Sequence, residues 1–183
     1  MLDYTETFYI DSSEKTARAQ LTCCLTSLLY DYKKAPVFLC IGSEKVSGDA
    51  LGPLIGSLLL EKRKDLSVFG TLTSPVHAVN LPHTIAEIHQ NFPENPVIAI
   101  DASLGIREHL HYLTIGRGSL EPGAGVHKLL GSVGDIFLTG IVAQAGPFSQ
   151  FALQRVPPNT VYSLAHIMAE GILAFFQSAE HIS

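Results

Sequence analysis

The chain has 183 residues, of which 46% are hydrophobic, which is the size of one ordinary domain with a sizeable core. Its 12 basic and 17 acidic residues give a formal charge of -5, which argues against direct binding to nucleic acid or to an anionic membrane surface. No apolar run approaches the roughly 20 residues that cross a bilayer, and the amino terminus lacks a basic region followed by an apolar one. We therefore expect a cytoplasmic protein.

The elements predicted along the chain alternate between helices and strands. In chain order they are a helix over 12–32, a buried strand over 36–41, a helix over 49–63, a short strand over 68–72 and a helix over 81–91. A strand over 97–100, strands over 109–115 and 135–143, and a terminal helix from Asn159 to about Phe176 follow. Because no repeat or long linker divides residues 1–183, we predict a single three-layer α/β domain. Its mostly parallel sheet has five or six strands, with helices on both faces.

Three cysteines, at positions 23, 24 and 40, form neither a CxxC pair nor a secreted disulfide framework. All three stand in apolar stretches, where cysteine usually behaves as a small hydrophobic residue. We therefore expect reduced, buried thiols and argue against a thiol protease.

Two aspartates follow the two most apolar strands. Asp49 lies in the glycine-containing run after Val37–Ile41, and Asp101 comes directly after Val97–Ile100. Open α/β sheets bind ligands at the carboxyl ends of their strands, and neighbouring strands lie about 4.8 Å apart. The two carboxylates are therefore expected to meet, where they can share a proton as acid and base or hold a divalent metal.

Each aspartate also has a structural explanation. Asp49 stands just ahead of a helical pattern, where aspartate is a favoured N-cap. Asp101 can satisfy its own backbone through an Asx-turn after the strand. From the sequence these explanations weigh about as much as the catalytic one.

A glycine-rich loop over residues 121–128 ends in His127, which the fold can bring to the two carboxylates as a third metal ligand or a proton carrier. His77 and His83 flank another loop and are rivals for that role, and a solvated loop histidine is the structural alternative. Backbone N–H groups of the loops can stabilise an oxyanion. The residues expected to bind substrate are Gly42, Ser43, Gly48, Ser103, Gly123 and Gly125. No G-x-S-x-G elbow surrounds either serine, so both are interpreted as turn residues and not as nucleophiles.

These motifs carry a family resemblance. The run Gly42–Pro53 with its Asp-Ala-Leu-Gly-Pro, Ile100-Asp101-Ala102 and the Pro-Gly-Ala-Gly loop at 122–125 resemble the germination protease family. Size and overall pattern are most similar to the smaller sporulation protein family called YyaC, and the resemblance covers about residues 35–145. It implies a phosphorylase/hydrolase-like fold and an aspartate pair at Asp49 and Asp101. It also implies proteolysis of small acid-soluble spore proteins inside the sporulating cell or spore.

The same spacing is similar to that of the hydrogenase maturation proteases. By position, the nickel-binding residues of those proteases correspond to Asp49, Asp101 and His127, so the resemblance implies a divalent metal, nickel or zinc, as a cofactor. Our leading hypothesis is a peptidase that uses the aspartate pair, with or without a metal. The alternative is a protease-like binding protein in spore formation that has lost turnover. Apolar side chains on the terminal helix, including Phe175 and Phe176, would permit a homo-oligomer.

Overall fold

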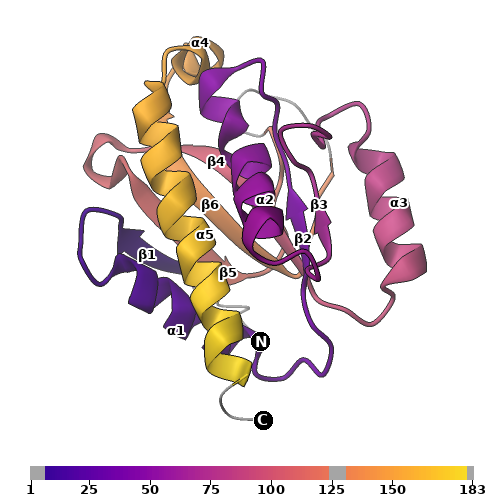
Figure 1. Ribbon diagram of the computed structural model, residues 1–183. Coiled ribbons are helices and arrows are strands. Elements are labelled where there is room, and N and C mark those ends of the chain that lie inside the picture. The colour runs from indigo at the N-terminus through magenta and orange to yellow at the C-terminus, as the bar shows by residue number, and fades with distance from the viewer. Residues whose placement is uncertain (1–6, 124–130, 181–183) are drawn as a thin grey trace, which may run out of the picture.

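Six strands form one sheet in the part of the chain that the computed structural model describes, residues 7–123 and 131–180 (Figure 1). The strands are β1 (Thr7–Asp11), β2 (Val37–Cys40), β3 (Val68–Phe69), β4 (Val97–Gly105), β5 (Tyr112–Arg117) and β6 (Ile136–Gln144). Their order is β1-β5-β6-β4-β2-β3. β5 pairs antiparallel with both of its neighbours, and the other pairs are parallel, so the predicted mostly parallel sheet is confirmed.

The central strands are those with continuous apolar sequence. All four residues of β2 are buried, as are the first five residues of β4. Strands covered on both faces need apolar side chains on both, which explains why these runs do not alternate between polar and apolar residues. The two strands pair in register from Val37 with Val97 to Cys40 with Ile100.

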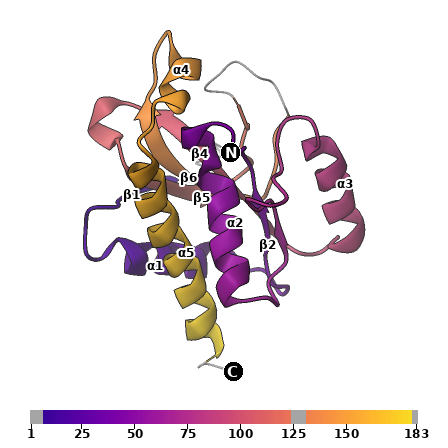
Figure 2. The ribbon, with the colours of Figure 1, turned by 45° about the horizontal axis from the view of Figure 1, so that its top comes forward.

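Helices cover both faces of the sheet and give the three layers that the sequence predicts. The helices α1 (Ala17–Leu29), α2 (Leu51–Lys62) and α5 (Pro158–Glu180) pack with the sheet in one hydrophobic core. The helix α3 (Leu81–Asn91) packs on the other face in a smaller core. Figures 1 and 2 show α2 and α5 side by side and α3 apart from them, beside β2 and β3. Shorter helical turns are η1 (Ser47–Ala50), η2 (Arg107–His109) and α4 (Ser149–Gln154).

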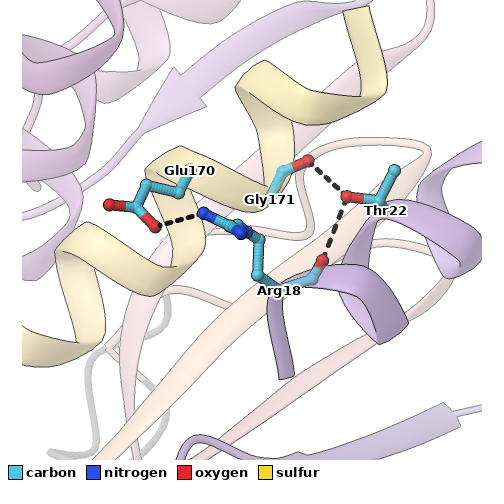
Figure 3. A network of polar contacts seen from close by, with 4 residues as sticks. All are labelled: Arg18, Thr22, Glu170 and Gly171. Carbon is cyan, nitrogen blue, oxygen red and sulfur yellow. Dashed lines mark hydrogen bonds and ion pairs between the residues drawn. The ribbon is translucent and has the colours of Figure 1, made fainter. Parts of the chain in front are cut away.

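The amino-terminal helix α1 packs against the last helix, α5 (Figure 3). Arg18 forms an ion pair of 3.1 Å with Glu170, and the Thr22 hydroxyl donates to the carbonyl oxygen of Gly171 at 3.0 Å. A Cβ atom at Gly171 would lie 2.7 Å from the Leu21 side chain, so a glycine is needed for this close approach. The buried Leu21 provides the stabilisation here, because exposed ion pairs contribute little.

Several predicted boundaries differ from the structure. The helix predicted over 12–32 begins only at Ala17, because Asp11 accepts hydrogen bonds from the backbone and hydroxyl of Ser13 and closes a turn there. The strand β1 and the helix α4 were not predicted. β3 has two residues, whereas the prediction over 68–72 had five. β4 continues to Gly105, so Asp101 lies inside a strand and not in the loop after it.

No helix among the described residues combines the length and the apolar character needed to cross a membrane.

Candidate active site

A cavity of about 390 Å³ opens just beyond the carboxyl end of β2 and beside Asp101 in the middle of β4. It contains both aspartates that the sequence singled out. The described residues that line it are Ile41, Gly42, Ser43, Lys45, Val46, Asp49, His77, Ala78, Val79, Asp101, Pro122 and Gly123. The cavity thus lies where an open α/β sheet is expected to bind a ligand.

The turn after β2 positions Asp49. Gly42 has φ of +143°, and a Cβ atom there would overlap the carbonyl oxygen of Asp49. The N–H of Ser43 donates to that same carbonyl oxygen at 3.1 Å, which ties the two ends of the turn together. Only glycine fits this combination of positive φ and close backbone approach.

Asp49 is half-buried and lies in η1, one residue before the N-cap position of α2, which Ala50 occupies without a side-chain cap bond. The N-cap explanation for Asp49 is therefore wrong.

The end of α4 and the segment after it hold η1 from outside the cavity. The Ser47 hydroxyl donates to the carbonyl oxygen of Val156 at 2.8 Å, and a Cβ atom at Gly48 would lie 2.8 Å from the Leu153 carbonyl oxygen. Gly48 is thus buried against this segment and is not among the described lining residues of the cavity. Its role in the structure is to let η1 pack closely, in contrast to the predicted substrate contact.

Asp101 is only 7% exposed and lies in β4. One oxygen, Oδ1, accepts a hydrogen bond of 2.7 Å from the N–H of Ala102. Burial, followed by the charge of Asp49, raises the pKa of Asp101 well above its ordinary value, whereas the Ala102 hydrogen bond lowers it by less. The Asx-turn explanation is wrong, because this bond reaches the next residue within a strand.

Ser103 lies two residues after Asp101 on β4, and its hydroxyl oxygen accepts a hydrogen bond of 2.9 Å from Thr139. Thr139 in turn pairs with Thr114 at 2.6 Å. Ser103 is not among the described residues of the cavity wall. It therefore takes part in a row of hydroxyl groups across three strands, and the predicted substrate contact is not seen. Gly42, Ser43 and Gly123 do line the cavity.

His77 reaches the cavity through a contact that the sequence does not reveal. A parallel bridge joins Ile41 to Val76, and the N–H of Gly42 donates to the Val76 carbonyl oxygen at 2.8 Å. Nδ1 of His77 accepts a hydrogen bond of 3.3 Å from the N–H of Val79. A neutral imidazole in this arrangement carries its proton on Nε2 and is a hydrogen-bond donor at that atom.

The predicted metal set is only partly within the described chain. Asp49 and Asp101 line one cavity, whereas His127 and Gly125 lie outside the described residues. Within residues 7–123 and 131–180, no group of three or more His, Cys, Asp and Glu side chains could hold a metal ion. The charge of Asp49 raises the pKa of Asp101, so a proton or a cation between these carboxylates would relieve their repulsion. Two carboxylates alone fit a shared proton, and a metal bound to them stays a prediction.

The cysteines do not provide a nucleophile in this cavity. Cys40, the last residue of β2, is buried, and burial raises the pKa of its thiol far above the ordinary value. Cys24 is half-buried and Cys23 is exposed on α1, which corrects the expectation that all three are buried. None of the three is among the described lining residues.

The sequence is similar to a protein family and to a Bacillus subtilis protein. The family model described as "Protein of unknown function (DUF1256)" matches residues 9–171. A Bacillus subtilis (strain 168) protein named "Uncharacterized protein YyaC" is 40% identical over 166 residues, which are 90% of this chain and 81% of that protein. The predicted resemblance to the YyaC family is thereby confirmed.

A solved structure shares the fold at lower identity. The [NiFe] hydrogenase maturation protease HycI from Thermococcus kodakarensis KOD1 superimposes with a TM-score of 0.55 at 17% identity. The match covers 84% of this chain and 98% of HycI. This confirms the predicted α/β fold, and at this identity it shows the fold alone.

Proposed function

The chain belongs to the DUF1256 family, and we propose that it is a peptidase in which Asp49 and Asp101 activate water against a peptide bond. One observation carries the proposal: a buried aspartate with a raised pKa shares a cavity with a second carboxylate. Carboxylate pairs whose environments differ are the usual means of having an acid and a base in one site. The fold shared with a maturation protease supports the same reaction class.

The two environments assign the two roles. Asp101 is the more deeply buried and its pKa is raised above that of an ordinary aspartate, so it is assigned as the acid. Asp49 is half-buried and acts as the base that takes a proton from water. The water oxygen bonds to the carbonyl carbon, the C–N bond breaks, and Asp101 protonates the departing amine nitrogen. Asp49 then holds the proton from water, and transfer of a proton from Asp49 to Asp101 restores the starting state.

An imidazole supplies the remaining donor at the cavity, because the backbone donors of the turn after β2 are occupied. Gly42 and Ser43 belong to the turn that lines it, and the N–H of each is already bonded, to Val76 and Asp49 respectively. Nε2–H of His77 is the donor suited to the developing negative charge on the carbonyl oxygen. A divalent metal held by Asp49 and Asp101 would supply Lewis-acid polarisation of that carbonyl.

As substrates we propose the small acid-soluble spore proteins that the family resemblance implied. The test is their cleavage, followed by mass spectrometry, with wild type, Asp49→Asn and Asp101→Asn, each with and without added nickel or zinc. Asp31→Asn is the matched control, since Asp31 is exposed and lies outside the cavity. Specific fragments that disappear in both cavity variants and persist in the control would support an aspartate-dependent peptidase.

Metal dependence of the same cleavage would separate metal-assisted hydrolysis from a shared-proton mechanism. Absence of cleavage under every condition, with all variants folded, would contradict the peptidase proposal and favour the protease-like binding protein.

A further inference from the structure

The strand that carries Asp101 is longer than its neighbour on one side. β4 pairs with β6 as far as Gly105, whereas its pairing with β2 ends at Cys40 and Ile100. The last hydrogen bond on the β2 side runs from the N–H of Ile41 to the carbonyl oxygen of Ile100 at 2.7 Å. After Ile41 the chain turns away at Gly42. The part of β4 beyond Asp101, the β4 residue that lines the cavity, thus has no partner on the β2 side in the described part of the chain.

Backbone direction alternates along β4 and identifies the groups at the open edge. The carbonyl oxygens of Pro96 and Ile100 accept from Val37 and Ile41 of the β2 segment, whereas that of Val97 accepts from Asp135 beside β6. Even-numbered residues therefore point their backbone groups toward β2. The register with β6 shifts between Ser103 and Leu104, but the carbonyl oxygen of Gly105 still accepts from Ala145 after β6, so the alternation along β4 persists. Beyond Ile41, this places the carbonyl oxygen of Ala102 and both backbone groups of Leu104 on the vacated side.

These edge groups have no partner strand in the described part of the chain. The N–H of Ala102 is satisfied by Asp101, but no backbone bond of the loop after β2 reaches Ala102 or Leu104. Residues 102–105 are half-buried, so part of their surface is open to solvent. Unpaired strand edges with unsatisfied donors and acceptors are the features by which proteins bind extended peptides through strand addition.

We propose that a segment of the protein substrate binds in extended form as an added strand on the free edge of β4 at Ala102–Gly105. This inference rests on the proposed peptidase function and names the conformation in which the substrate is held. The added strand takes the position next to β4 that β2 would hold if it continued beyond Ile41. This position begins directly after Asp101, so the substrate backbone passes the carboxylates of Asp101 and Asp49. A folded, helical segment cannot form these bonds, which explains how such a site selects unfolded or extended substrate regions.

The cavity wall provides for the side chains of such a segment. Side chains of a strand alternate between two faces, so every second substrate residue faces the side on which Asp101 and the β3–α3 loop lie. Val79, on that loop, is 87% exposed and lines the cavity together with Val46 and Pro122. An apolar substrate side chain at alternate positions would cover Val79 and remove it from water.

The first test is hydrogen exchange of backbone amides measured by NMR on ¹⁵N-labelled Asp49→Asn protein. The probe is the purified mixture of small acid-soluble spore proteins, added to saturation, with the amide of Thr139 in β6 as the internal reference. We expect exchange at the Leu104 amide to slow about 10-fold or more, while Thr139 changes little. Unchanged exchange at Leu104, with or without binding elsewhere, would overturn the strand-addition proposal.

A second test compares Leu104→Pro with Leu104→Ala. Both remove the leucine side chain, but only proline also removes the N–H that points to the open edge, and proline is tolerated on strand edges. Relative to Leu104→Ala, we expect Leu104→Pro to raise KM about 3- to 10-fold with a smaller change in kcat. Equal KM values in two folded variants would contradict the proposal. Should Leu104→Pro fail to fold, the exchange measurement decides alone.

The outcomes separate this inference from the proposed function. Protection at Leu104 without cleavage by wild type would support the binding mode and contradict the peptidase. Cleavage without protection at Leu104 would support the peptidase and contradict the strand-addition binding mode. Protection that appears without the probe and rises with protein concentration, together with dimers in sedimentation, would show that a second copy pairs with the edge, and would overturn the substrate assignment.

Discussion

Two aspartates accept a hydrogen bond from a backbone N–H of β4, with different results. At the amino end, Asp135 accepts a hydrogen bond of 2.8 Å from Val97 and is exposed to solvent. In the middle of the strand, Asp101 accepts one of 2.7 Å from Ala102 but is buried beside the charge of Asp49. The comparison teaches that hydrogen bonding to the backbone does not distinguish a structural aspartate from a reactive one. Burial and a second carboxylate make the difference.

The largest effect should appear in catalysis. We expect Asp49→Asn and Asp101→Asn each to reduce kcat/KM for spore-protein cleavage about 10²- to 10⁴-fold, because each removes a proton-transfer group. Asp135→Asn keeps an acceptor oxygen for Val97 and should remain within about twofold of wild type. The rates are measured by mass spectrometry of the fragments. A loss of similar size in Asp135→Asn would break the comparison.

The turn that positions Asp49 should be sensitive to a single methyl group. Gly42→Ala places a Cβ atom against the Asp49 carbonyl oxygen at positive φ, so we expect a loss of roughly 2–4 kcal/mol in the free energy of unfolding. Gly131→Ala is the matched control, because Gly131 also has positive φ, +83°, but no atom of the described residues lies within 4 Å of the added Cβ. That change should cost about 1 kcal/mol. Equal losses in urea unfolding would show that the contact with Asp49 is unimportant.

The pH dependence of the free energy of unfolding should distinguish Asp101 from Asp135. The folded-state pKa of Asp101 is raised above its unfolded value of about 3.9, so its contribution to stability is present below that pH and is lost as pH rises through the folded pKa. Asp101→Asn removes this loss, and we expect it to be more stable than wild type at pH 8 by about 1–3 kcal/mol. The advantage should vanish near pH 3.

Thermal unfolding between pH 3 and pH 8 measures the stability difference between Asp101→Asn and wild type. Asp135→Asn, beside the amino end of β4, is the control. A stability difference for Asp101→Asn that does not change with pH would argue against a raised pKa in the folded protein.

The smallest effect is expected beside the site. Ser103→Ala removes the acceptor for the Thr139 hydroxyl, which should cost about 1 kcal/mol or less, because Thr139 keeps its partner Thr114. Cleavage should persist at more than a tenth of the wild-type rate, since Ser103 is not a nucleophile in the proposed reaction. Complete loss of cleavage in a folded Ser103→Ala protein would require a different mechanism.

The sequence predicted the central strands but not the short or edge elements of the fold. Apolar runs predicted β2 and β4 because strands buried on both faces need apolar residues throughout. The strand β1 was missed, since it pairs only with β5 at the edge and carries a partly exposed pattern. The helix α4 has six residues, too few for helical periodicity to be recognised. Asp101 was expected in a loop because apolar sequence ends there, although pairing with β6 extends the strand to Gly105.

By itself, the sequence of this protein determined the α/β class, the two central strands and an aspartate that follows each of their apolar runs. These features are local, since periodicity and glycine positions record which residues are buried and where the chain turns. Only the tertiary structure decided that Asp101 is buried beside Asp49 and that the Ile41–Val76 bridge brings His77 to the same cavity. It also decided that β4 continues beyond the residue at which its pairing with β2 ends. Each of these depends on which segments become neighbours in the sheet, and no local pattern along the chain encodes that lateral order.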